Sequence, residues 1–388
     1  MNANSLIPYG RHSVSESDIE AVERVLRSDW LTQGRETPAF EQALADRCEA
    51  PYAVATNSAT SALHLACLAL GLGPGDTLWT SPVTFAASAN GALYCGAKVA
   101  FVDIEPETGL LCPRALERKL RAARQSGALP KIVVPVHLAG QSCDMAALAA
   151  LADEYGFYLL EDAAHALGGS YRDRPVGGCE HSAIAVFSFH PVKSIACGEG
   201  GMATTRDPEL AERMALLRTH GITRDQACMG RAAEGDWDYD QIALGFNYRL
   251  SDIHAALGRS QLARLDDFVA RRRALAERYD VALADLPLAP LVQRADRTSA
   301  WHLYVVRLRG ADSAERRDAL LAGLRARGIG ATLHYRPVFA LDWHRARDDG
   351  SCPEAVRYGR DALTLPLFPE LTEEQQDRVV ACLRELLS

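Results

Sequence analysis

Short apolar runs alternate with amphipathic stretches through the first half of the chain, and this alternation most constrains the fold. Strands are predicted at 52–56, 77–80, 99–104, 131–136, 157–160, 183–189 and 201–205. Helices are predicted at 15–28, 36–48, 61–70, 85–94, 113–123, 144–155 and 208–220. Runs that are apolar throughout suit strands of a parallel sheet covered by helices on both faces. The sequence therefore predicts an α/β domain whose functional loops lie at strand ends.

The second half of the chain predicts a smaller α+β domain. A charged, glycine-containing stretch at 221–239 separates the two halves. The elements predicted after it are one long helix, one strand and two further helices, at 250–283, 303–308, 313–327 and 372–387. We expect a large domain over 1–250, including an N-terminal segment at 1–15, and a small domain over 251–388.

Composition and charge exclude several classes of protein. With 388 residues, of which 48% are hydrophobic and 24% charged, the chain is typical of a globular protein with a sizeable core. Its formal net charge of -8 gives no electrostatic reason to expect nucleic acid or an anionic membrane as partner. No apolar run is long enough to span a bilayer, and residues 1–11 lack the pattern of a signal peptide, so we expect a cytoplasmic protein. The 10 cysteines form no Cys-x-x-Cys pair, which favours reduced core residues over disulfides or a metal site.

Lysine is scarce in this chain, and Lys193 stands in an unusual setting. Of 42 lysines and arginines, only four are lysines, at 98, 119, 131 and 193. Lys193 follows an apolar strand and precedes the glycine cluster Gly198–Gly201. A lysine amine that loses its proton can form a Schiff base, which arginine cannot. The alternative is an exposed surface lysine.

Two other positions fit a site for pyridoxal phosphate. Asp162 ends a predicted strand and could keep a heteroaromatic ring nitrogen protonated, as this cofactor requires, or it could cap the next helix. Ser58, Ala59 and Thr60 lie where a strand meets a helix N-terminus, which favours a bound phosphate. Ordinary helix capping explains these three residues equally well.

Three further residues could complete such a site. Ser188, near the strand edge before Lys193, offers a hydroxyl group, although it could be an ordinary strand-end serine. Phe85 could stack on a cofactor ring or belong to the core. His165 could contact the phenolic oxygen of the ring or be an ordinary helix residue. Taken together, these residues describe a pyridoxal phosphate site with Lys193 as the Schiff-base lysine.

The chain resembles the DegT/StrS-type nucleotide-sugar aminotransferases from Tyr9 to the loop at 334–337. The motifs that carry the resemblance are 57–63, 161–168, 188–193 with 198–201, and 245–252. The resemblance implies an aspartate-aminotransferase-like fold of type I and a homodimer with active sites at the subunit interface. It also implies pyridoxal phosphate bound through Lys193. By the same match Asn247 would reach the cofactor phosphate of the partner subunit, the alternative being a simple turn residue.

Within this family the chain is similar to the 4-aminotransferases of pseudaminic acid biosynthesis, through the stretches 31–34, 134–144 and 189–193. That similarity implies transfer of the amino group of L-glutamate to C4 of a UDP-linked 4-keto-6-deoxy-N-acetyl-hexosamine. The nucleotide-sugar contacts that it implies are Tyr9, Asp29, Trp30, Leu31, Thr32, His334, Tyr335, Arg336 and Pro337. One departure from the family pattern is Ile195-Ala-Cys197, where relatives often carry hydroxyl residues, and it concerns how the lysine loop is held.

Other functions stay open at this point. A family member acting on another keto sugar nucleotide, linked to GDP or dTDP, would share the motifs, because a few side chains decide the substrate. A sugar dehydratase of the family would carry histidine in place of Lys193. A non-catalytic sugar-sensing regulator would not need the lysine, the aspartate and the phosphate motif together. We therefore expect a transaminase in which Lys193 also moves the proton as general base.

Overall fold

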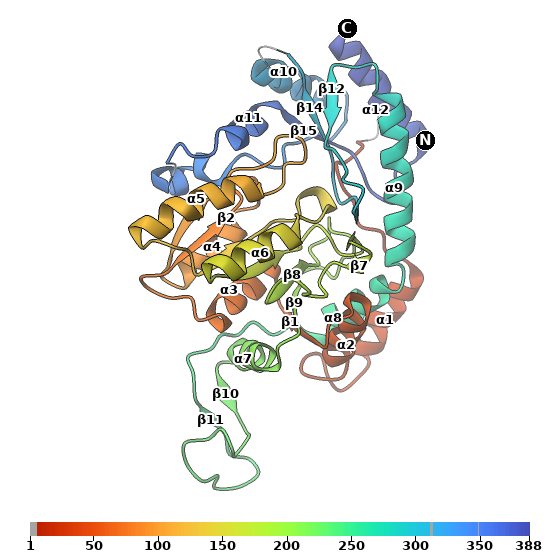
Figure 1. Cartoon of the computed structure of the whole chain (residues 1–388). Helices are drawn as coiled ribbons and strands as arrows, with labels where there is room; N and C mark the ends of the chain where they lie inside the picture. Colours follow the sequence, from red (N-terminus) through yellow and green to blue (C-terminus); the bar gives the residue numbers. More distant parts are fainter. Residues whose placement is uncertain (1–5, 311–312, 348) are drawn as a thin grey trace.

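A seven-stranded sheet forms the centre of the computed structural model, which describes residues 6–310, 313–347 and 349–388 (Figure 1). The first five residues of the predicted N-terminal segment lie outside these ranges. The strands of the sheet are β1 (Tyr52–Thr56), β2 (Thr77–Thr80), β3 (Lys98–Phe101), β4 (Ile132–Val134), β5 (Tyr158–Asp162), β8 (Ile184–Ser188) and β9 (Gly201–Thr205). Their order across the sheet is β1-β9-β8-β5-β4-β2-β3.

Neighbouring strands of this sheet run parallel, with β9 as the exception. Strand β9 is antiparallel to both β1 and β8, between which it lies. The remaining pairs, β2 with β3, β2 with β4, β4 with β5 and β5 with β8, are parallel. The predicted mostly parallel α/β fold of type I is therefore confirmed.

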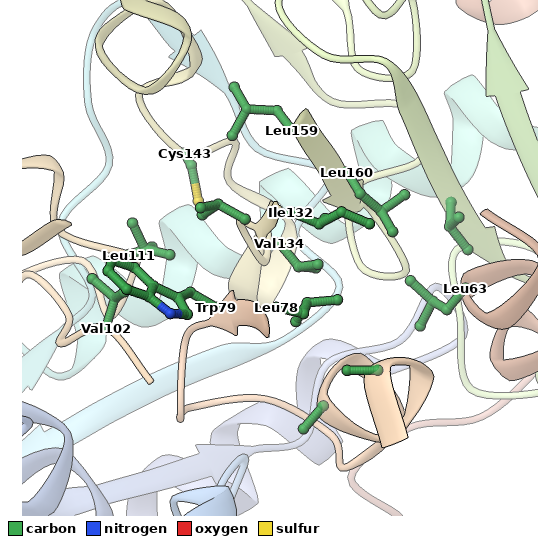
Figure 2. Close-up of a cluster of buried hydrophobic side chains, with 14 of the residues drawn as sticks. Leu63, Leu78, Trp79, Val102, Leu111, Ile132, Val134, Cys143, Leu159 and Leu160 are labelled. Atoms are coloured by element: carbon green, nitrogen blue, oxygen red, sulfur yellow. The ribbon is translucent and has the colours of Figure 1, made fainter. Parts of the chain in front are cut away.

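Helices cover the sheet on both faces, which explains why its strands are apolar throughout. The helices of this part are α1 (Glu16–Leu26), α2 (Glu36–Cys48), α3 (Ala59–Ala69), α4 (Ala87–Tyr94), α5 (Pro113–Ser126), α6 (Met145–Tyr155) and α7 (Pro208–Arg218). Figure 2 shows how side chains of β2, β4 and β5 meet a helix side chain in one apolar cluster, among them Leu78, Ile132, Val134, Leu159, Leu160 and Leu63 of α3. Burying each such side chain stabilises the fold by roughly 1.5–3 kcal/mol.

The long helix predicted over 250–283 is wrong, because the structure has two helices there. Helix α8 (Asp252–Leu262) packs on α1 and α2, and α9 (Leu265–Ala282) continues toward the second half of the chain. The break falls at Arg264, whose φ of -107° and ψ of 8° are not helical. The Arg264 guanidinium pairs with the buried Asp18 of α1 and donates to the carbonyl of Ser13 at 3.2 Å. These distant contacts override a local pattern that contains no proline at the break.

A second apolar core lies in the C-terminal part of the chain. Its antiparallel sheet has the order β12-β14-β15. The elements are β12 (Leu288–Pro290), β14 (Tyr304–Leu308), β15 (Ala362–Leu365), α10 (Ser313–Ala326), α11 (Pro353–Asp361) and α12 (Glu373–Leu387). Ile7, Leu275 and Tyr279 from other segments complete this core. The expected division of the chain into domains at residue 250 stays a prediction.

A hairpin arm, residues 221–245, projects from the body of the molecule (Figure 1). It contains the antiparallel strands β10 (Ile222–Thr223) and β11 (Asp240–Gln241). Its side chains Trp237, Tyr239 and Leu244 are 67%, 51% and 84% exposed. Apolar side chains that gather on an exposed segment mark a contact surface.

The remaining short elements connect these parts. A small separate sheet has the order β13 (Arg297–Thr298), β6 (Ser170–Tyr171) and β7 (Arg174–Pro175). Short 3₁₀ helices lie at Leu138–Gly140, Val338–Ala340 and Asp342–Arg347. Over the described ranges, every helix falls short of the length and apolar character that a bilayer crossing needs.

Candidate active site

A cavity of about 390 Å³ lies where the loops after β5 and β8 meet the N-terminus of α3. Segments from both halves of the chain line it. Ten of the predicted site residues come together there, namely Tyr9, Ala59, Thr60, Phe85, Asp162, His165, Ser188, Lys193, His334 and Tyr335. The sequence motifs that contain them therefore converge on one place.

The other predicted site residues lie outside this cavity. They are Asp29, Trp30, Leu31, Thr32, Asn247, Arg336 and Pro337. Trp30 and Leu31 are 63% and 48% exposed, whereas Pro337 is buried against Gly359. The backbone carbonyl of Asn247 accepts a hydrogen bond from the side chain of Asn57 at 3.4 Å.

Lys193 sits in a tight turn after β8, where its backbone N–H donates to the carbonyl of His190 at 2.9 Å. Burial in the cavity lowers the pKa of the Lys193 amine to about 8, although the nearby Asp162 acts in the opposite direction. Such a shift makes the unprotonated amine accessible near neutral pH. Ile195, Ala196 and Cys197, which follow Ser194, are buried, so apolar packing fixes this loop.

Asp162 is the last residue of β5 and is buried. Its carboxylate accepts a hydrogen bond from the hydroxyl of Ser88 at 2.6 Å and from the backbone N–H of Ala164 at 3.2 Å. Thr84 in turn lies 2.7 Å from the Ser88 hydroxyl. A buried carboxylate held this way, inside the cavity, fits a protonated pyridine nitrogen.

Helix α3 begins at the cavity and offers a place for a phosphate. The side chain of Ser58 caps the helix by accepting the backbone N–H of Ser61 at 3.1 Å. Capping and phosphate binding are compatible, because the amides of Ala59 and Thr60 in the first turn have no intrahelical partner. Gly201 lets β9 approach this turn, since a Cβ there would lie 2.3 Å from the nitrogen of Ala59.

His165 and Tyr335 meet across the cavity, the first from the loop after β5 and the second from the C-terminal half. The Nε2 atom of His165 lies 3.1 Å from the Tyr335 hydroxyl, and Nδ1 accepts the backbone N–H of Ala139 at 3.3 Å. Burial, followed by the charge of Lys193, holds the pKa of His165 well below its usual value, so its imidazole is neutral. Burial and then Lys193 also lower the pKa of His334 to about 4.

Phe85 does not belong to the core, so the interpretation of this residue as a core phenylalanine is wrong. Its side chain is 64% exposed and lines the cavity. Its ring centroid is 6.5 Å from that of Tyr335. The side chain is therefore available to a ligand ring.

Several residues of the site carry no clear signal in the sequence. Ser88, which Thr84 contacts, holds Asp162, although no local pattern links Ser88 to a carboxylate 74 residues away. Behind Asp162, the buried Glu161 accepts hydrogen bonds from His137 at 2.6 Å and from Ser182. His302 lines the cavity, and its ring centroid lies 4.3 Å from that of His165. Of these residues, His137 had a signal in the sequence, because it lies in the stretch 134–144 that carries the family similarity.

This fold and this cavity are those of an enzyme that uses pyridoxal phosphate as its cofactor. The chain belongs to the DegT/DnrJ/EryC1/StrS aminotransferase family, whose model matches residues 12–384. It is accordingly a sugar aminotransferase, and pyridoxal phosphate is its cofactor.

Solved structures agree with this assignment. The chain is similar to PseC of Helicobacter pylori, an aminotransferase involved in the biosynthesis of pseudoaminic acid, with 29% identity, 99% of each chain covered and a TM-score of 0.89. The PMP-form of the putative sugar aminotransferase Spr1654 from Streptococcus pneumoniae shows 30% identity over 98% of each chain, with a TM-score of 0.89. DesV of S. venezuelae is 36% identical over 96% of this chain and 94% of its own, with a TM-score of 0.84.

The residues of the cavity fit the cofactor. A helix N-terminus suits its phosphate, a buried carboxylate suits its ring nitrogen, and an amine of lowered pKa suits its carbonyl carbon. No group of three or more His, Cys, Asp or Glu side chains within the described ranges could hold a metal ion.

Proposed function

We propose that this enzyme transfers the amino group of L-glutamate to C4 of a UDP-linked 4-keto-6-deoxy-N-acetyl-hexosamine in the biosynthesis of pseudaminic acid. The observation that carries the proposal is the similarity to PseC of Helicobacter pylori along 99% of both chains. The sequence stretches 31–34, 134–144 and 189–193 support it independently. We place this activity in the cytoplasm. The second candidate is amination of another keto sugar nucleotide, which the 30% identity to the putative sugar aminotransferase Spr1654 supports to the same degree as the 29% identity to PseC supports the first.

Pyridoxal phosphate, when bound, supplies the electron sink that makes a carbon next to nitrogen acidic. Lys193 would hold the cofactor and then, once displaced, act as the general base. With a pKa of about 8, roughly one Lys193 amine in ten is unprotonated at pH 7, against fewer than about one in a thousand for an ordinary lysine. The same amine would return the proton in the second half of the reaction, because both halves share one cavity.

Other residues would orient the cofactor. Asp162, aligned by Ser88, would keep the ring nitrogen protonated. The amides of Ala59 and Thr60, with the hydroxyl of Ser188, would hold the phosphate at the start of α3. Phe85 would cover one face of the ring, and His165 would act at its phenolic oxygen through the Tyr335 hydroxyl, which lies 3.1 Å from Nε2 of His165.

We further propose that the active enzyme is a homodimer. The predicted contacts Asp29–Thr32 and Asn247 lie outside the cavity of their own chain, as do Arg336 and Pro337. A second copy would bring Asn247 of the partner subunit to the cofactor phosphate. The exposed apolar side chains of the arm, residues 221–245, support this arrangement, because contact with another copy would bury them. Tyr9 and His334 would then contact the nucleotide sugar from the same chain.

The function is tested by incubating the holoenzyme with glutamate and UDP-, GDP- and dTDP-linked 4-keto sugars, with mass spectrometry of the products. The expected result is a 4-amino product from the UDP-linked N-acetyl sugar. Preference for a GDP- or dTDP-linked sugar would contradict the assignment to pseudaminic acid biosynthesis, but not the membership of the aminotransferase family. Absence of product from every sugar, with ordinary binding of the cofactor, would favour a regulator. Lys193→Ala is the matched control, and it must give no product.

A further inference from the structure

Tyr335 comes from the C-terminal half of the chain, and its ring lines the cavity that contains Lys193 and Asp162. Its hydroxyl lies 3.1 Å from Nε2 of His165, and the two rings stack at 22° with centroids 6.0 Å apart. The question is which of these two groups donates the hydrogen bond.

The tautomer of His165 answers this question. Its Nδ1 accepts the backbone N–H of Ala139 at 3.3 Å and therefore carries no proton. A neutral imidazole has one proton, which must then be on Nε2. His165 therefore donates to the oxygen of Tyr335. The hydrogen of the Tyr335 hydroxyl is left over and has to point elsewhere.

That hydrogen has no acceptor among the side chains and carbonyls of the described residues, where His165 is the hydroxyl's single hydrogen-bond partner. The ring of Tyr335 is partly buried and lines the same cavity as Lys193, so the cavity is the space that this hydrogen can reach. A polar hydrogen held in a largely buried place is costly to leave unpaired, which indicates that a ligand supplies the acceptor.

The His165 ring is itself fixed from behind. The ring of His302 packs against it with centroids 4.3 Å apart. The backbone carbonyl of His302 is held at 3.1 Å by Arg272, a buried guanidinium that also reaches the carbonyl of Leu367 at 2.8 Å. Gly140 closes tightly on the same segment, because a Cβ there would lie 2.7 Å from the nitrogen of Trp301. This support keeps the direction of the Tyr335 hydroxyl constant.

We propose that the Tyr335 hydroxyl, aimed by His165, donates a hydrogen bond to an oxygen atom bound beside Lys193. Two oxygens share the required chemistry, namely the phenolic oxygen of the cofactor and the keto oxygen of the sugar. Tyr335 is then a catalytic residue that acts at the reacting atoms, and not only a contact of the nucleotide sugar. His165 is a positioning residue. For the keto oxygen the proposal rests on the proposed function.

The test uses Tyr335→Phe, which removes the hydroxyl and keeps the ring. Tyr279→Phe is the matched control, because its hydroxyl donates to the carbonyl of Pro366 at 3.1 Å inside the second core. Both variants are prepared as holoenzymes, and their melting temperatures are compared with that of the wild type. His165→Leu should reproduce the effect of Tyr335→Phe, and combining the two should add little further loss.

Two measurements separate the two oxygens. If the phenolic oxygen is the acceptor, the visible absorbance of the lysine-bound cofactor, measured without substrate, titrates about one pH unit higher in Tyr335→Phe. If the keto oxygen is the acceptor, this titration is unchanged and single-turnover amination of the keto sugar slows on the order of 10²-fold. Single turnover is measured with whichever keto sugar nucleotide the wild type converts, so failure of the UDP-sugar assignment does not affect the result. An unchanged titration together with an unchanged rate, or an equal loss in Tyr279→Phe, would overturn the proposal.

Discussion

The cavity-lining part of the site and the part proposed to act on a second copy are built in different ways. Asp162, Ser188 and Lys193 stand at or just after the ends of central strands, and buried neighbours fix them. The segment Asp29–Thr32 and the arm, residues 221–245, are largely exposed and far less supported by the core. The comparison teaches that the residues proposed for the chemistry are held by the core of one chain, whereas the residues proposed to act across a dimer are exposed and have few supporting neighbours in their own chain.

The first prediction concerns the amine of Lys193, the central group of the cavity-lining part. Lys193→Ala should lower turnover by more than about 10⁴-fold, because neither cofactor attachment nor proton transfer has a replacement. Turnover and the visible absorbance of the cofactor are measured together. Lys131→Ala is the control, since Lys131 binds Asp76 and the carbonyl of Gly71 at the surface. Full turnover in Lys193→Ala would show that the chemistry lies elsewhere.

The second prediction concerns the charge on β5. Asp162→Asn keeps the shape of the side chain and removes the negative charge that holds the ring proton. Turnover should fall on the order of 10²- to 10³-fold, with the cofactor still bound. Asp207→Asn is the comparison, because Asp207 only caps α7. Equal rates in Asp162→Asn and the wild type would contradict the role of this carboxylate.

The third prediction tests whether the exposed part acts on a second copy. Asn247→Ala should weaken turnover by about tenfold through poorer binding of the cofactor phosphate. Mixing and reassembling Lys193→Ala with Asn247→Ala in equal amounts gives hybrid dimers that contain one intact site each. About a quarter of wild-type activity should return, since half of the dimers are hybrids. A mixture that stays at the average of its two components, about one twentieth of wild-type activity, would show that each site belongs to a single chain.

The fourth prediction is a pH effect of smaller size. Burial lowers the pKa of Lys193 to about 8, so the unprotonated amine gains population as pH rises toward 8 and levels off above it. The rate at which apoenzyme binds pyridoxal phosphate should follow this curve and not that of an ordinary lysine, near 10.5. In Asp162→Asn the midpoint should move down by less than about one pH unit, because a negative charge that favours the ammonium is lost. A midpoint above pH 10 would contradict the lowered pKa of Lys193.

The sequence predicted the elements of the central sheet well, because each buried strand carries its own apolar signature. It also predicted the residues of the cavity that occupy strand ends or a helix start. It failed where distant contacts decide, as at Arg264, where pairing with Asp18 divides one expected helix into two. The antiparallel direction of β9 depends on pairing and has no local pattern. Ser88 and His302 were missed for the same reason, since their importance lies in the side chains they touch.

The position of β9 has a consequence for how the molecule assembles. Strand β1 joins the sheet through β9 alone, and Gly201 of β9 pairs with both Thr56 and Ser188 while touching the first turn of α3. During synthesis, the residues that cradle the phosphate emerge about 140 positions before the strand that closes the cradle, a long-range pairing of the kind that slows folding. A nascent chain that ends before residue 201 would contain Ala59, Thr60, Asp162, Ser188 and Lys193 and still have no place for the cofactor. The cofactor would therefore bind the sheet only after β9 has paired, and its binding would stabilise that pairing.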